Sequence, residues 1–215
     1  GYEPINPISI VANKKGLLNK LMQYDHSIRA MNYLSLALLK KPYMGEGYNL
    51  AYKKSLFYKV GGFIKHYNLS AGDDDMFINQ VANDKNTSVV LSPLSQMSFD
   101  TYRTYKDWIK SKKSNIISRK HFKLSHRLLL TILPSSTILF YLSIAAIFLI
   151  ALPWQYAVIA ILLKYILQIF VYYKAFKKLE IKKIAIFAPI LEIYQIILNL
   201  ILELRIIMTK KTKWR

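Results

Sequence analysis

The sequence contains no cysteine, so a disulfide framework and a zinc site with cysteine ligands are both excluded. Acidic residues are scarce as well, with 12 Asp and Glu against 31 Lys and Arg, and the formal net charge is +19. Because 53% of the residues are hydrophobic, the chain is not an acidic disordered segment. It opens on Gly1 without a basic and then apolar leader, so no secretory signal peptide is visible, and we expect a fragment of a longer protein.

The excess of positive charge suits either nucleic acid or an anionic membrane surface. Long apolar runs lie beside the basic clusters, which favours the membrane, and nucleic acid is not an expected partner. Trp108, Tyr102 and Tyr105 stand among lysines ahead of the first apolar run. We interpret these aromatic residues as interfacial anchors rather than as a platform for stacking RNA bases.

Two apolar runs predict a membrane hairpin. Residues 128–151 carry no formal charge and reach ~36 Å as a helix, which is longer than a hydrocarbon core. Residues 154–173 form the second run, interrupted only by Lys164 and Gln168. Lysines and arginines flank both ends of the hairpin, at residues 110–127 and 174–183, so the positive-inside rule places the preceding soluble part in the cytoplasm.

Residues 184–208 predict a third span or an interfacial helix. Glu192, Gln195, Asn199 and Glu203 fall on one side of this helix, where they face either a partner helix in the bilayer or water. Both readings stay open, because the lysines that follow would end up outside after a third span. If the segment spans, Glu192 matches Lys164 in depth. We then predict an ion pair, because an unpaired charge near the bilayer centre costs ~2.5 to 3.5 kcal/mol.

Residues 1–126 alternate short apolar segments with turns and predict an α/β domain. Helices are expected over residues 16–40, 53–60 and 76–83, and a short strand over residues 89–91. We find no internal repeat. The chain therefore reads as a soluble part, residues 1–126, followed by a membrane region, residues 127–215.

The run Asp73, Asp74 and Asp75 is the sharpest chemical feature. Three adjacent carboxylates repel one another, which tends to raise at least one pKa, as a general base requires. The plainer reading is an ordinary helix start, with Asp73 as the N-cap and acidic residues in the first turn. The two readings are compatible, since a base at a helix start is well oriented.

Other motifs are weaker. Residues 45–49 form a two-glycine loop that brings backbone amides near a ligand, but the loop lacks the lysine of a phosphate-binding loop. His26, His66, His121 and His126 share no ligand spacing, so no metal site is predicted in this chain.

Three segments taken together resemble the acceptor half of a bacterial, membrane-anchored family 2 glycosyltransferase of the GT-A type. They are residues 42–57 (PYMGEGYNLAYKKSLF), residues 61–63 (GGF) and residues 72–77 (GDDDMF). Their order, their spacing and the trailing membrane helices agree with that family, and the resemblance covers essentially the whole chain. It implies a partial GT-A-like α/β domain followed by two to three membrane helices, in the bacterial inner membrane.

The resemblance implies an inverting sugar transfer from a nucleotide-activated donor to a glycan or lipid-linked acceptor. The base that deprotonates the acceptor hydroxyl maps onto Asp74, with Asp73 as the alternative. The acceptor and donor-site loops map onto the following residues: Gly45, Gly47, Asn49, Gly72 and Asp75. A divalent metal, Mg²⁺ or Mn²⁺, is implied as well, with its ligands in an upstream donor-binding half that we expect outside this chain.

The chain departs from the family pattern where positive charge should meet the departing diphosphate. A Gln-x-x-Arg-Trp-like element is expected just after Trp108, and Ser111 and Ser114 stand at the Gln and Arg positions. Tyr48 likewise replaces an arginine that is common in the glycine loop.

Three lysines could substitute on this side of the site, namely Lys110, Lys112 and Lys113, although a lysine does not reproduce the bidentate arginine fork. The losses motivate a competing hypothesis, a non-catalytic membrane protein that is either a decayed transferase or an interaction subunit. The bilayer with its anionic headgroups is an expected partner under both hypotheses.

Overall fold

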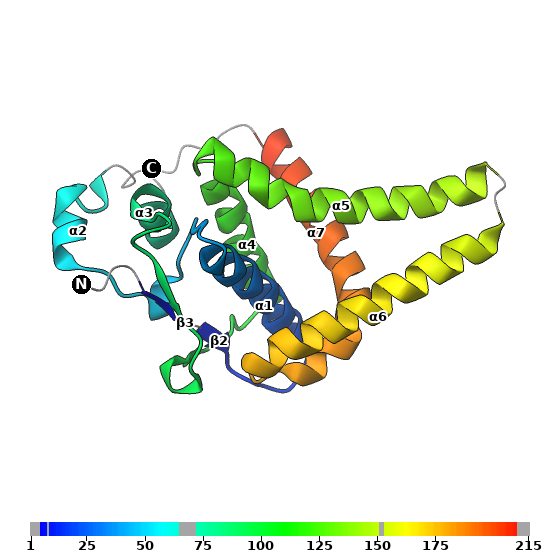
Figure 1. Cartoon of the computed structure of the whole chain (residues 1–215), viewed down its shortest axis with the longest axis horizontal. Helices are drawn as coiled ribbons and strands as arrows, with labels where there is room; N and C mark the ends of the chain where they lie inside the picture. Colours follow the sequence, from blue (N-terminus) through cyan, green and yellow to red (C-terminus); the bar gives the residue numbers. More distant parts are fainter. Residues whose placement is uncertain (1–4, 8, 65–71, 151–152, 210–215) are drawn as a thin grey trace. The chain divides into compact units, whose positions relative to one another are not determined.

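The computed structural model describes residues 5–7, 9–64, 72–150 and 153–209. It divides into two compact units, residues 1–123 with 197–215, and residues 124–196. The described residues are mostly helical and contain little sheet (Figure 1). The first unit contains the helices α1 (Leu17–Leu38), α2 (Lys54–Lys59), α3 (Asp73–Val81) and α4 (Tyr105–Arg119), with short 3₁₀ turns η1 (Gly47–Asn49) and η3 (Pro93–Ser95).

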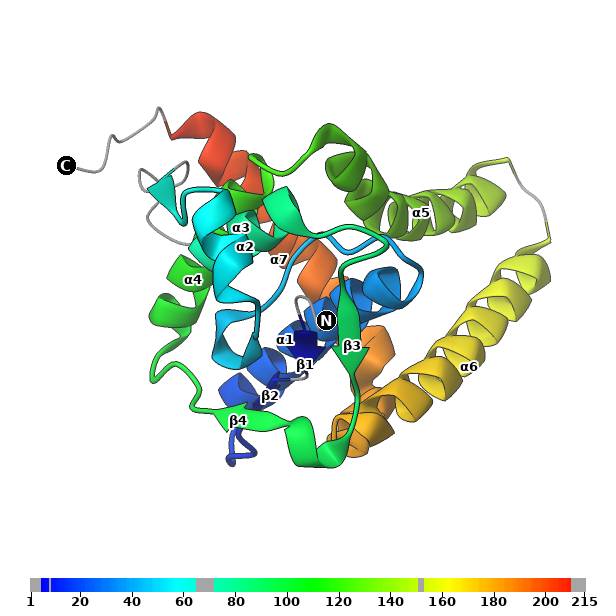
Figure 2. The ribbon, with the colours of Figure 1, turned by 60° about the vertical axis from the view of Figure 1, so that its left-hand side comes forward.

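The sheet consists of two separate parallel pairs of three-residue strands. β1 (Ile5–Pro7) pairs with β3 (Ser88–Val90), and β2 (Ser9–Val11) pairs with β4 (Met97–Phe99) (Figure 2). The predicted strand over residues 89–91 is therefore present as β3. Each pair joins chain segments more than 80 residues apart, so these strands depend on the packing of the whole unit.

The predicted helices over residues 16–40 and 53–60 are confirmed as α1 and α2. The helix predicted over residues 76–83 begins earlier, at Asp73, and ends at Val81. Its N-cap is Gly72 in the left-handed region (φ +83°), without a side-chain cap. The expectation that Asp73 is the N-cap is thus wrong, because the chain turns at the glycine, which tolerates this backbone conformation. All three aspartates lie in the first helical turn.

Buried aromatic packing fixes the orientation of α3. Phe77 and Ile78 are completely buried and cluster with Val81 and Ala82. Phe57 from α2 packs against this cluster, with its ring 5.8 Å from the ring of Phe77. This packing therefore holds α3, and with it the acidic first turn, in one orientation.

The second unit contains the hairpin helices α5 (Leu124–Leu149) and α6 (Trp154–Lys178), then η4 (Lys182–Phe187) and the first residues of α7 (Ala188–Met208). α5, α6 and the continuous segment Lys182–Met208 are each long and apolar enough to cross a membrane. Many large apolar side chains on α5 and α6 are exposed, as lipid-facing side chains are. These three helices indicate a membrane protein.

A polar cluster ties three helices of this unit together. Lys164 on α6 forms an ion pair with Glu192 on α7, as predicted. The Nζ of Lys164 also donates to the hydroxyl of Tyr141 on α5 at 3.1 Å, and that hydroxyl donates to Glu192 at 3.1 Å. Glu203, the last residue of the predicted polar stripe on α7, is exposed, so the stripe is not buried along its whole length.

Candidate functional site

The three aspartates at the start of α3 differ sharply in exposure. Asp73 is exposed, Asp74 is half-buried and Asp75 is buried with 7% of its surface exposed. Successive positions on a helix point about 100° apart, so one turn presents one carboxylate to solvent and turns another inward. Asp74 lies between these extremes, held by the protein and still partly accessible.

The glycine loop meets this acidic turn. The backbone N–H of Gly47 donates a hydrogen bond to Oδ2 of Asp74. A Cβ on Gly47 would lie only 2.7 Å from the same oxygen, so this close approach requires glycine. Two motifs that the sequence separates by more than twenty residues therefore form one site.

The side chain of Glu46, the residue before Gly47, is buried in a cluster of polar side chains. Its side chain is 2% exposed and forms an ion pair with Arg29 of α1. The hydroxyl of Ser9 donates to the same carboxylate, and Nε2 of His26 lies 3.3 Å from it. This buried polar cluster fixes the backbone from which the Gly47 N–H reaches Asp74.

Burial dominates the electrostatics of the acidic turn. Desolvation raises the pKa of Asp74, although the Gly47 N–H opposes the rise. Desolvation raises the pKa of Asp75 to about 8 despite the nearby charge of Arg29. For Glu46, burial opposes ionisation, but the charges of His26 and Arg29 outweigh it and lower the pKa. Asp75 is thus largely protonated at neutral pH, and Asp74 is a carboxylate with raised basicity.

The remaining loop residues are placed near this point. Gly45 is buried, and the side-chain amide of Asn49 donates to the carbonyl of Ser95 at 2.8 Å. Gly72 abuts α4, because a Cβ there would lie 2.6 Å from Oγ of Ser118. The structure therefore brings the acidic turn of α3, the glycine loop and the end of α4 together.

The residues proposed for the diphosphate side lie on α4, where Trp108 and Lys112 are engaged in contacts inside the protein. Trp108 is buried, with 4% of its surface exposed, and the Nζ of Lys112 lies 5.6 Å from the centre of its ring. Lys112 is itself buried in an ion pair with Asp25 of α1. Lys113 is half-buried and Lys110 is exposed.

The interpretation of Trp108 as an interfacial anchor is wrong, because the indole packs inside the first unit, where it reaches neither headgroups nor RNA bases. Tyr102 and Tyr105 are exposed. The hydroxyl of Tyr102 donates to Ser111 at 2.7 Å, and the ring of Tyr48 stacks on Phe99 with centroids 4.2 Å apart. Neutral contacts thus occupy Tyr48, where the resemblance expects an arginine, and Ser111, where it expects a glutamine.

Two of the three carboxylates in the acidic turn are engaged or neutral. Asp74 accepts a backbone N–H, and Asp75 is buried and largely protonated. Within the described ranges, no group of three or more Asp, Glu or His side chains is arranged to hold a metal ion.

Sequence reasoning missed the supporting cluster of Ser9, Arg29 and Glu46, and it considered His26 only as a metal ligand. A signal was present, because His26 and Arg29 are three residues apart and share one face of α1. Their buried partner, Glu46, comes from a distant loop, and no local pattern identifies such a contact. No protein-family model matches the chain, and neither a curated protein nor a solved structure matches it.

Proposed function

We propose that this chain is the acceptor-side and membrane part of a membrane-bound inverting glycosyltransferase, with Asp74 as the general base. The observation that carries the proposal is the half-buried Asp74 carboxylate, raised in pKa and held by the amide of Gly47. A base needs partial access to the acceptor, a fixed direction and a pKa closer to neutral than that of a free aspartate. Asp74 combines these properties, whereas Asp73 is exposed and Asp75 is buried.

In the proposed reaction, Asp74 takes the proton of the acceptor hydroxyl as its oxygen attacks the anomeric carbon of the donor sugar. The new C–O bond forms while the bond to the nucleotide diphosphate breaks, and attack from the opposite face inverts the anomeric centre. The diphosphate leaves with the bonding electron pair, and Asp74 ends protonated. A neutral Asp75 spares Asp74 the repulsion of a second buried charge.

The proposal assigns donor binding to the upstream half that the resemblance implies. The partners are then a nucleotide-sugar donor, a glycan or lipid-linked acceptor and the bilayer. The basic residues that flank the hairpin support a cytoplasmic position for the soluble part at a bacterial inner membrane.

The test uses the full-length protein in membranes, with a panel of nucleotide sugars and the released nucleoside diphosphate as the readout. Asp74→Asn should lower turnover by about 10²- to 10⁴-fold, the usual effect of losing a general base, while donor binding stays intact. Asp73→Asn is the matched control and should retain turnover. The reverse pattern would move the role to Asp73, and full turnover in both variants would refute the assignment.

The second candidate is a non-catalytic membrane protein. A specific observation favours it, because the ammonium of Lys112 is already paired with Asp25, and the arginine position of the family motif holds the neutral Ser114. A departing diphosphate would then meet little positive charge from this part of α4. A wild-type protein that binds a nucleotide sugar without releasing diphosphate would favour this candidate.

A further inference from the structure

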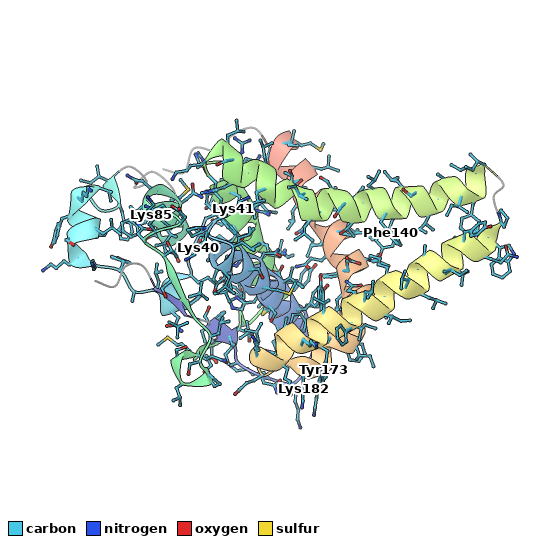
Figure 3. The ribbon with its side chains drawn as sticks, viewed as in Figure 1. Lys40, Lys41, Lys85, Phe140, Tyr173 and Lys182 are labelled. Carbon is cyan, nitrogen blue, oxygen red and sulfur yellow. The ribbon has the colours of Figure 1, made fainter. Side chains whose placement is uncertain are left out.

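The C-terminal end of α1 presents an apolar pair followed by a basic pair on the surface of the first unit. Leu38 and Leu39 are 56% and 69% exposed, so these two large apolar side chains are not packed in the core. Lys40 and Lys41, labelled in Figure 3, follow directly in the chain, and both are exposed. We call residues 38–41 the 38–41 patch.

The backbone of the patch is strained at a lysine. Lys40 has φ +63°, in the left-handed region. The N–H of Lys41 donates to the carbonyl of Leu36 at 2.7 Å, so the helix ends in the turn that usually places glycine at this position. A residue with a Cβ is disfavoured here, so Lys40 holds a strained backbone conformation.

The patch lies close to the point where the chain enters its first membrane helix. The side-chain amide of Asn79 donates to the carbonyl of Tyr43 at 2.7 Å, and its oxygen accepts the backbone N–H of Lys123 at 3.0 Å. The rings of Tyr43 and Phe122 have their centres 6.0 Å apart. Tyr43 follows Lys41 by two residues, and α5 starts directly after Lys123. The patch and Lys123, the residue directly before α5, are therefore joined through one network of contacts within the first unit.

We propose that the 38–41 patch docks on the anionic surface of the bilayer that α5 enters. Leu38 and Leu39 enter the headgroup region, and Lys40 and Lys41 lie beside the lipid phosphates. Exposed apolar side chains with adjacent lysines are the combination that binds anionic membranes, and the attraction acts only within about a Debye length of ~8–10 Å. The proposal depends on α5 crossing the membrane and is independent of the glycosyltransferase assignment.

The absence of cysteine allows a direct test in the whole chain. Leu39→Cys is labelled with the environment-sensitive dye NBD and reconstituted into vesicles of phosphatidylcholine alone or mixed with phosphatidylglycerol. We expect a blue shift of the dye in the mixed vesicles that weakens with added salt. The matched control is Leu17→Cys, at the opposite end of α1, which is 72% exposed and has Lys14, Lys15 and Lys20 nearby. It lies ~33 Å away along the helix and should report water in both vesicles.

Two charge variants complete the test. Lys40→Gln and Lys41→Gln should each weaken docking on the mixed vesicles about fivefold, the value of one lysine at an anionic surface. Lys40→Gly should weaken docking equally while raising the thermal stability of the chain, because glycine relieves the left-handed strain. If Lys40 only stabilised the C-terminal end of the helix dipole, the effect of Lys40→Gln would be the same in neutral and in anionic vesicles.

Three results would overturn the proposal. The first is a dye at position 39 that behaves like the dye at position 17, and the second is an equal shift in neutral and mixed vesicles. The third is a shift that follows the density of protein rather than the charge of the lipid, which would assign the patch to contact with a second copy of the chain.

Discussion

Replacing Glu192 by glutamine should leave Lys164 without its counter-ion in an apolar helical hairpin. The two side chains are only 15% and 19% exposed, so water cannot readily replace the lost partner. The lysine keeps one other acceptor, the hydroxyl of Tyr141 at 3.1 Å. Its ammonium also lies 5.3 Å from the ring centre of Phe140 and 5.1 Å from that of Tyr165.

The expected loss of stability is about 2–4 kcal/mol. Removing one partner of a buried pair typically costs about 3–5 kcal/mol, and the remaining hydroxyl and the aromatic faces offset about 1 kcal/mol of it. Replacing both charges, as in Lys164→Met with Glu192→Met, removes the uncompensated charge and should restore most of the stability. The two single changes should therefore be strongly non-additive.

The assay is the free energy of unfolding of the whole chain in detergent micelles, compared across the cycle of single and double variants. Glu203→Gln is the matched control, because it makes the same chemical change at an exposed glutamate of α7 and should cost less than about 0.5 kcal/mol. Equal costs for Glu192→Gln and Glu203→Gln, or additive effects in the cycle, would refute the reasoning.

The same pair bears on the membrane topology. We predict that the segment Lys182–Met208 crosses the bilayer, because the pair places Glu192 beside a lysine of the second span. Cysteine introduced at Thr212 should then react with a membrane-impermeant maleimide from the side of the membrane opposite residues 1–123. Reaction only from the same side as residues 1–123 would show that this segment lies at the interface.

Three further predictions concern the acidic turn. Gly47→Ala should destabilise the first unit by about 1–3 kcal/mol, because its Cβ would press on Asp74, and an unchanged thermal midpoint would contradict this. Glu46→Gln should cost about 3 kcal/mol, since it strands the partly buried charge of Arg29, and the added change Arg29→Met should recover part of the loss in the same unfolding assay. Burial raises the pKa of Asp75 to about 8, above its unfolded value, so its contribution to stability is full in acid and falls as the pH rises from about 4 to 8. The difference in unfolding free energy between the wild type and Asp75→Asn should vary with pH over that window, and a constant difference would show that the pKa of Asp75 is not raised.

The sequence alone was sufficient for the elements whose formation depends on local properties. The membrane helices follow from length and apolar composition, which is why α5 and α6 appear within a few residues of the predicted segments. α1 and α2 follow from helical periodicity and punctuation by glycine and proline. The ion pair of Lys164 with Glu192 was also predictable, because two buried charges of opposite sign at matching depth have few other partners.

Only the tertiary structure decided how the acidic turn is supported and which side chains it exposes. The run of three aspartates looks uniform in the sequence, yet burial separates Asp73, Asp74 and Asp75 into exposed, half-buried and buried groups. Trp108 is a second example. In the sequence, an aromatic residue among lysines resembles a membrane anchor, but in the structure its side chain is buried in the interior. The contacts of Glu46 with Arg29 and Ser9 join segments far apart in the chain, and so does the contact of Gly47 with Asp74. Such contacts form only when the whole unit closes and excludes water, because desolvation and close approach are properties of the packed fold and not of any local run of residues.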